Sequence, residues 1–190
     1  MSRTMTAQPK QDPLAQRDTI TFAELGDGVV VIRIVGRGSF ANSVEFKQLT
    51  DRLADAAGSK PYRFIVDMEQ VTTLDSTFMG ALAGAGLRHK RDTGEQMTLC
   101  NVNEQCCRLL ETVGIKHFVQ VRACPTEAAP AQTVEFREAD RAEISRADQI
   151  IHMIEAHENL VTIDNENQAR FESVLKYLRE SLERENQKKG

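Results

Sequence analysis

The sequence lacks any apolar run of the roughly 20 residues that a membrane-spanning helix needs. Its first eighteen residues are polar and contain no apolar core like that of a signal peptide. These two absences predict a cytoplasmic protein with no segment embedded in a membrane.

The chain also lacks an excess of basic residues. Its formal charge is −4, and residues 138–190 hold 12 acidic and 8 basic side chains, which leaves 16 of each sign in residues 1–137. Nucleic acids and anionic membrane surfaces both attract basic stripes. We therefore expect neither nucleic acid nor a membrane as a partner.

No cysteine pattern typical of a metal or redox site is present. The four cysteines show no CxxC spacing and no clustering with histidine. They are expected to pack as small hydrophobic side chains in a reducing compartment. These cysteines are Cys100, Cys106, Cys107 and Cys124.

Catalytic patterns are missing as well. His152 and His157 are five residues apart, a spacing that splays them on a helix. The segment 36–38 (Gly-Arg-Gly) lacks the length and the lysine of a phosphate-binding loop. Asp67 and Asp75 have no histidine or cysteine nearby in sequence, so we interpret them as a strand-end turn residue and a charge that favours a helix start. We expect no enzymatic activity, no metal and no cofactor.

The overall composition is that of a globular protein. The chain has 190 residues, of which 41% are hydrophobic and 27% charged, which suits one domain of ordinary size plus an appendage. We divide it into a disordered arm (1–18), an α/β domain (19–121), a linker (122–137) and a helical extension (138–190).

Within the domain, the pattern predicts the order β-β-α-β-α-β-α-β. The expected strands cover residues 19–25, 29–35, 64–66, 97–102 and 117–121, and the expected helices follow Asn42, Ser76 and Asn103. Successive strand–helix–strand units indicate a mixed, mostly parallel sheet with an antiparallel first strand. The second strand is apolar on both faces, which is typical of a strand covered on both sides.

The extension shows two apolar stripes at helical spacing, over residues 144–154 and 171–182. Between them lie the β-branched run 161–163 and the polar run 164–167. We interpret this as two helices forming a hairpin, with one bent continuous helix as the alternative. Each stripe must pack on its sibling, on the domain, or on another chain, in which case the C-terminal helices assemble a homo-oligomer.

The segment 71–82 is the most informative part of the sequence. An extended, β-branched run leads into Asp75 and Ser76, and a stretch of small residues with helical potential follows. This places the Ser76 hydroxyl at a helix start, where free N–H groups and the helix dipole favour an anion. Locally this is also ordinary helix capping, so a cap without regulation is the alternative interpretation.

Several segments together resemble the STAS domain of bacterial anti-sigma-factor antagonists. They are Asp67–Ser76, the small-residue helix after it, Asn101-Val102 and Leu109–Ile115. The resemblance covers residues 19–121 in matching element order and implies a STAS-like fold.

The resemblance also implies a switch that exchanges partners. In that family, the serine after the motif aspartate is phosphorylated by a serine kinase that doubles as an anti-sigma factor, and a PP2C-type phosphatase reverses this. The unphosphorylated form captures the kinase and frees the sigma factor. The resemblance therefore implies Ser76 as phosphoacceptor, with Asp75 in the docking surface. Among the adjacent hydroxyls, Thr77 is the best rival acceptor.

One position departs from the family pattern, because Phe78 stands where glycine is usual. Its ring is interpreted either as a contact for the partner or as part of the core. The predicted partner-binding residues are Asp75, Ser76, Thr77, Phe78 and Met79. The alternative hypothesis is a constitutive scaffold assembled through the C-terminal helices and never phosphorylated.

Overall fold

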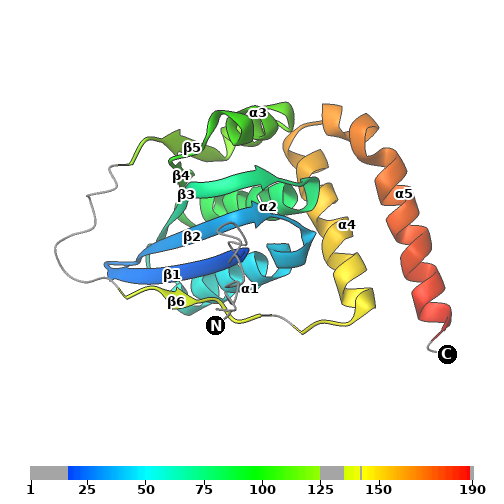
Figure 1. The fold of residues 1–190 in the computed structure, drawn as a ribbon, viewed down its shortest axis with the longest axis horizontal. Helices are drawn as coiled ribbons and strands as arrows, with labels where there is room; N and C mark the ends of the chain where they lie inside the picture. The colour runs from blue at the N-terminus through cyan, green and yellow to red at the C-terminus, as the bar shows by residue number, and fades with distance from the viewer. Residues whose placement is uncertain (1–16, 125–134, 142, 189–190) are drawn as a thin grey trace, which may run out of the picture.

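The computed structural model describes residues 17–124, 135–141 and 143–188. Its centre is a six-stranded sheet in the order β5-β4-β3-β2-β1-β6 (Figure 1). Strands β2 to β5 are parallel neighbours, whereas β1 is antiparallel to β2 and to β6. The predicted mixed, mostly parallel α/β sheet is confirmed. The strands are β1 (Thr19–Gly26), β2 (Val29–Gly38), β3 (Arg63–Leu74), β4 (Met97–Cys100), β5 (Val119–Arg122) and β6 (Arg137–Glu138).

Helices α1 and α2 pack side by side and cover one face of the sheet (Figure 1). Helix α4 packs against α2, and α5 packs on the far side of α4. The helices are α1 (Phe40–Ala57), α2 (Ser76–Thr93), α3 (Glu104–Thr112), α4 (Arg146–Ile163) and α5 (Glu166–Gln187), and the 3-10 turn η1 covers Ile115–His117.

Among the described residues, helices α1 and α2 cover one face of strand β2. Val30, Ile32 and Ile34 are buried beneath them, whereas Val29 and Val31 on the other face are half-buried. Full cover on both sides of this strand stays a prediction.

Strand β3 is longer than predicted and runs without a break to the residue before Asp75. Asp67 lies inside this strand, where its carboxylate pairs with Arg33 of β2 at 3.0 Å. The interpretation of Asp67 as a strand-end turn residue is therefore corrected.

Helix α1 begins earlier than Asn42, the cap that the sequence predicted. Ser39 is the N-cap, and the Asn42 side chain reaches back to accept the Ser39 N–H at 2.9 Å. The helix ends at Gly58, as predicted, with φ +58°.

Two details near the last strands also differ. His117 belongs to η1 and not to a strand. Cys100 and Cys124 form a disulfide that ties the end of β4 to the segment after β5, which corrects their predicted packing as free thiols. Cys106 is buried with a free thiol, as predicted, and Cys107 is free and partly exposed.

The C-terminal extension forms two antiparallel helices (Figure 1). The run 161–163, expected between the helices, completes α4, because packing overrides the weak helix propensity of β-branched residues. Asn167 anchors the turn, and its fully buried amide donates to the carbonyls of Val113 at 3.0 Å and Leu160 at 2.8 Å.

Most of the predicted arm (1–16) and of the predicted linker (125–134) lies outside the described residues. Inside the predicted linker, Arg137 and Glu138 form β6 against β1. The predicted domain boundaries stay predictions. No helix among the described residues is long and apolar enough to cross a membrane.

Candidate functional site at the start of helix α2

Asp75 connects the starts of two helices. It is the N-cap of α2, and its Oδ1 accepts the N–H of Phe78 at 2.8 Å. Its Oδ2 accepts the N–H of Phe40, the first residue of α1, at 2.7 Å. Both bonds satisfy amides that have no partner within their own helix. Asp75 therefore fixes the local geometry around Ser76.

Ser76 is the first residue of α2 and is partly exposed. Its Oγ lies 3.0 Å from Nε2 of His157 on α4. The other ring nitrogen, Nδ1, lies 2.7 Å from the carbonyl oxygen of Met153. Because a carbonyl only accepts, Nδ1 carries the proton of the neutral ring, and Nε2 accepts the hydroxyl proton of Ser76.

The other predicted partner-binding residues are buried. Thr77, Phe78 and Met79 are 5%, 0% and 6% exposed. The Phe78 ring packs against Phe46 of α1 with centroids 5.3 Å apart, so Phe78 is part of the core. Asp75 and Ser76 are the members of the predicted set that solvent reaches; binding of a partner by this set stays a prediction.

The sequence did not predict that two further residues lie at this site. Phe40 is 52% exposed and lies beside Asp75, which binds its amide; it was missed because the start of α1 was placed at Asn42. His157 lies 81 residues from Ser76, and no local pattern pairs a helix start with a histidine so far along the chain.

Helix α4 packs against the small residues of α2. A Cβ added at Gly80 would overlap the backbone of Ala156, so the two helices touch there through main-chain atoms. One turn later, a Cβ at Gly84 would come within 2.5 Å of the Asn159 amide, which donates to the Gly80 carbonyl at 3.3 Å. The close approach predicted for α2 is thus made by the C-terminal extension.

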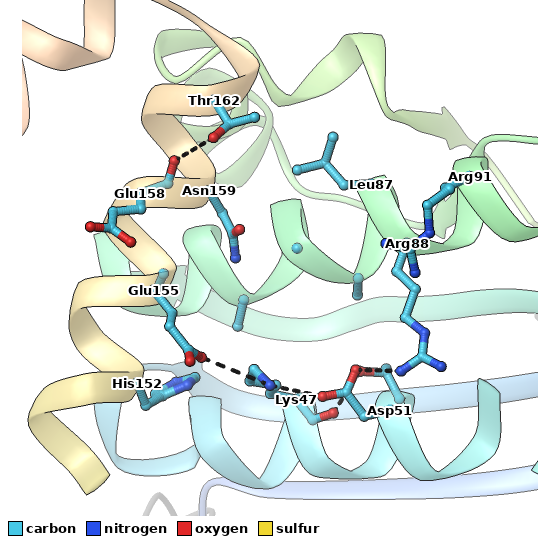
Figure 2. Close-up of a pocket in the computed structure, with 15 residues that line it drawn as sticks. Lys47, Asp51, Leu87, Arg88, Arg91, His152, Glu155, Glu158, Asn159 and Thr162 are labelled. Carbon is cyan, nitrogen blue, oxygen red and sulfur yellow. Dashed lines mark hydrogen bonds and ion pairs between the residues drawn. The ribbon is translucent and has the colours of Figure 1, made fainter. Parts of the chain in front are cut away.

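A hollow of about 450 Å³ opens where α1, α2 and α4 meet (Figure 2). Four of its charged side chains pair with one another. Lys47 contacts Asp51 at 2.8 Å and Glu155 at 3.9 Å, while Arg88 contacts Asp51 at 3.0 Å (Figure 2). Charges that neutralise one another in this way leave little field to attract a charged ligand.

His152 lies at the edge of this hollow, with its Nε2 2.9 Å from the hydroxyl of Ser43 on α1. Burial, with a smaller contribution from the charge of Lys47, lowers the pKa of His152 to about 4. The ring is therefore neutral at pH 7 and acts as a polar contact between α4 and α1. Among the described residues, no group of three or more His, Cys, Asp or Glu side chains is arranged to hold a metal ion.

Solved structures with a similar fold include proteins of two kinds. A putative anti-sigma factor antagonist from Thermotoga maritima is 20% identical, with 56% of this chain and 88% of that chain covered and a TM-score of 0.48. An anti-sigma factor antagonist from Mycobacterium paratuberculosis is 19% identical, with 55% and 86% covered and a TM-score of 0.47. The murine anion transporter Slc26a9 is 22% identical, with 53% and 19% covered and a TM-score of 0.40.

A comparison with proteins of curated function returned no match. The model of the STAS domain family matches residues 23–129, more than half of the chain. The element order, the sheet topology and this match agree, and the chain belongs to the STAS domain family.

Proposed function

We propose that this protein is an anti-sigma-factor antagonist controlled by phosphorylation. Unphosphorylated, it binds a serine kinase that also acts as an anti-sigma factor, and a PP2C-type phosphatase restores this form after Ser76 is phosphorylated. The observation that carries the proposal is the position of Ser76, a partly exposed hydroxyl on the first residue of α2 in a STAS domain.

The geometry around Ser76 supports a charge-based switch. A phosphate at the first residue of a helix meets the positive end of its dipole, so the fold tolerates it. The same group adds roughly −1.5 to −2 charges to the face that a partner contacts. A repulsion of about 1.4 kcal/mol weakens binding tenfold, so a modest penalty suffices to exchange partners.

The docking surface we propose centres on Asp75, Ser76 and Phe40. Thr77, Phe78 and Met79 lie directly beneath it, in the core. They support the surface from below, while the exposed ring of Phe40 supplies an aromatic contact of the kind enriched in binding hot spots.

Phosphotransfer is the first test. The purified protein is incubated with ATP and each serine kinase of its own cell, and its peptides are analysed by mass spectrometry. We expect one phosphate, on Ser76, with labelling abolished in Ser76→Ala and retained in Thr72→Ala, a matched change at an exposed residue of β3 whose hydroxyl donates to the Gly36 carbonyl at 3.2 Å. Labelling that persists in Ser76→Ala, or no labelling by any kinase, contradicts the proposal.

Binding to the same kinase is the second arm of the test. We expect Ser76→Asp to raise the Kd at least about tenfold, and Phe40→Ala to raise it without preventing the protein from folding. A Kd that is the same for Ser76→Asp and wild type would remove the charge-based mechanism.

The alternative, a constitutive scaffold, rested on the two apolar stripes of the extension. In the structure the second stripe packs within the chain, where Phe171, Leu175 and Leu178 are buried. The first stripe is divided, because Ala147 is buried whereas Ile151 is 40% exposed. Most of the apolar surface on which the scaffold alternative rests is therefore covered by the chain itself.

A further inference from the structure

We propose that His157 is the base that accepts the hydroxyl proton of Ser76 when this serine attacks a phosphoryl donor. This inference rests on the proposed function, because it assigns a catalytic residue to phosphorylation at that same site. His157 belongs to α4 and lies outside the residues that the STAS family model matches. The C-terminal extension would thus supply part of the chemistry by which the domain is modified.

The two reacting groups are in hydrogen-bond contact. Nε2 of His157 lies 3.0 Å from Oγ of Ser76, within the distance over which a general base takes up a proton. The Met153 carbonyl, 2.7 Å from Nδ1, holds the proton of the neutral ring on that nitrogen. The lone pair of Nε2 therefore faces the hydroxyl. A nucleophile, a base and a group that orients the base are the parts of an activated serine.

The surroundings of His157 hold its ring in this orientation. The residue is 3% exposed, and the ring of Phe171 on α5 packs against it in an edge-on arrangement, with centroids 5.2 Å apart. Ser76, in contrast, is partly exposed. The base thus lies on the buried side of the hydroxyl, which leaves the solvent side to the phosphoryl donor.

Phosphorylation by ATP then moves one phosphoryl group and one proton. The bond from Oγ of Ser76 to the γ-phosphorus forms, the bond from that phosphorus to the ADP oxygen breaks, and ADP leaves with its electron pair. The hydroxyl proton moves to Nε2 of His157, and the new phosphate beside the ring compensates the resulting positive charge. Because the phosphate carries roughly −1.5 to −2 charges, the site still becomes negative, as the charge-based switch requires.

A second serine–histidine pair provides a matched control. Nε2 of His152, also on α4, lies 2.9 Å from the hydroxyl of Ser43 on α1. Ser43 is 0% exposed, so a phosphoryl donor does not reach it. Of these two pairs, that of Ser76 combines the contact to a histidine with a hydroxyl that solvent reaches.

A fluorophosphonate tests the pair without a kinase. Activated serines attack its phosphorus with loss of fluoride, which requires the same proton transfer from the hydroxyl. The full chain is treated as wild type, His157→Gln and His152→Gln, and peptide mass spectrometry follows Ser76 and Ser173, an exposed serine of α5. In wild type, we expect Ser76 to react at least about tenfold faster than Ser173. His157→Gln should lower the Ser76 rate at least about tenfold, and His152→Gln should leave it unchanged.

Phosphotransfer from the kinase provides a second readout. In a single turnover, we expect His157→Gln to slow phosphorylation of Ser76 at least about tenfold, while the Kd for the kinase stays within about twofold of wild type. Glutamine separates proton transfer from positioning, because its amide oxygen accepts the same hydrogen bond but does not act as a base. The wild-type rate should also fall in heavy water, and His157→Gln should lose this difference.

The comparison of Ser76 with Ser173 is made within the wild-type chain, so it does not depend on the folding of a variant. Fluorophosphonate labelling of Ser76 that is no faster than that of Ser173 would overturn the proposal. Equal Ser76 rates in wild type and His157→Gln, with either reagent, would also overturn it. Absence of phosphate on Ser76 with every kinase refutes the proposed function, whereas the fluorophosphonate rates test His157 independently, so the two failures are distinguishable.

Discussion

The two carboxylate oxygens of Asp75 bind backbone amides of two different helices, at 2.8 Å to Phe78 and 2.7 Å to Phe40. A single side chain thereby sets the distance between the positive ends of α1 and α2. Ser76 follows directly, so the position of its hydroxyl depends on this double cap.

Asp75→Ala should lower the free energy of unfolding by about 2 kcal/mol, because it removes a helix cap and leaves a second amide without its acceptor. Urea denaturation measures the loss. Asn165→Ala is the matched control, since Asn165 is the N-cap of α5 but its side chain makes no cap hydrogen bond. We expect the control to stay within about 0.5 kcal/mol of wild type; equal losses would assign Asp75 no special role.

Local chemistry explains which site residues were predictable. A short polar pair before a run of small residues marks a helix start, so Asp75 and Ser76 were found from the sequence. Phe40 and His157 reach the site through tertiary contacts with Asp75 and Ser76. Phe78 was ambiguous, because an aromatic in the first turn of a helix faces the core or a partner depending on what lies across from it.

At the scale of elements, α2 is packed on two sides. Its apolar face contacts the sheet and α1, and its glycine stripe contacts α4. A helix with three glycines in its interior is less stable in isolation, and the close approach of α4 offsets this.

Gly80→Ala tests this packing. The added methyl group would overlap the Ala156 backbone, so we expect a loss of about 1–3 kcal/mol of stability, the usual cost of overpacking, together with faster hydrogen exchange in α4. In the control Gly86→Ala, on the same helix, the methyl group lies 3.3 Å from the nearest atoms, Phe118 O and Val119 Cγ1. A gain in helix propensity offsets that milder contact, and a comparable loss in both variants would contradict the proposed contact.

The order and types of the elements were predictable, because apolar periodicity and caps are local properties. The boundaries of the helices and strands were less predictable. The continuous β3 passes through polar Glu69 and Gln70, which interrupt the pattern, and η1 replaces a predicted strand start where Gly114 takes φ +72°. Strand β6 is only two residues long, too short for a periodic pattern to reveal.

At the scale of the whole molecule, the position of the extension on the domain is the feature that no sequence pattern indicated. The apolar stripes predicted two packed helices but allowed three partners for them. Contacts between residues more than seventy positions apart, such as Ser76 with His157 and Asn159 with Gly80, decide among the three.

The contact of α4 with α1 makes stability depend on pH. The pKa of His152 is about 4 in the folded protein and about 6.5 in an unfolded chain. The unfolded chain therefore binds the proton more tightly, so stability is complete above about pH 6.5 and falls as the pH drops toward 4.

Between pH 7 and pH 5, we expect His152 to account for a loss of about 2 kcal/mol in the free energy of unfolding. Urea denaturation at both pH values, in wild type and His152→Gln, isolates this contribution from those of His89 and Glu45, whose pKa values are also shifted, the first downward and the second to about 7. A His152→Gln profile parallel to that of wild type would refute the assignment.

The short strand β6 fixes where the hairpin begins. It is bonded to β1, and the next residue, Ala139, donates to the Ile20 carbonyl at 2.9 Å, so residues 140–145 join this anchor to α4. A connection this short reduces the chain entropy that is lost when α4 packs on α2.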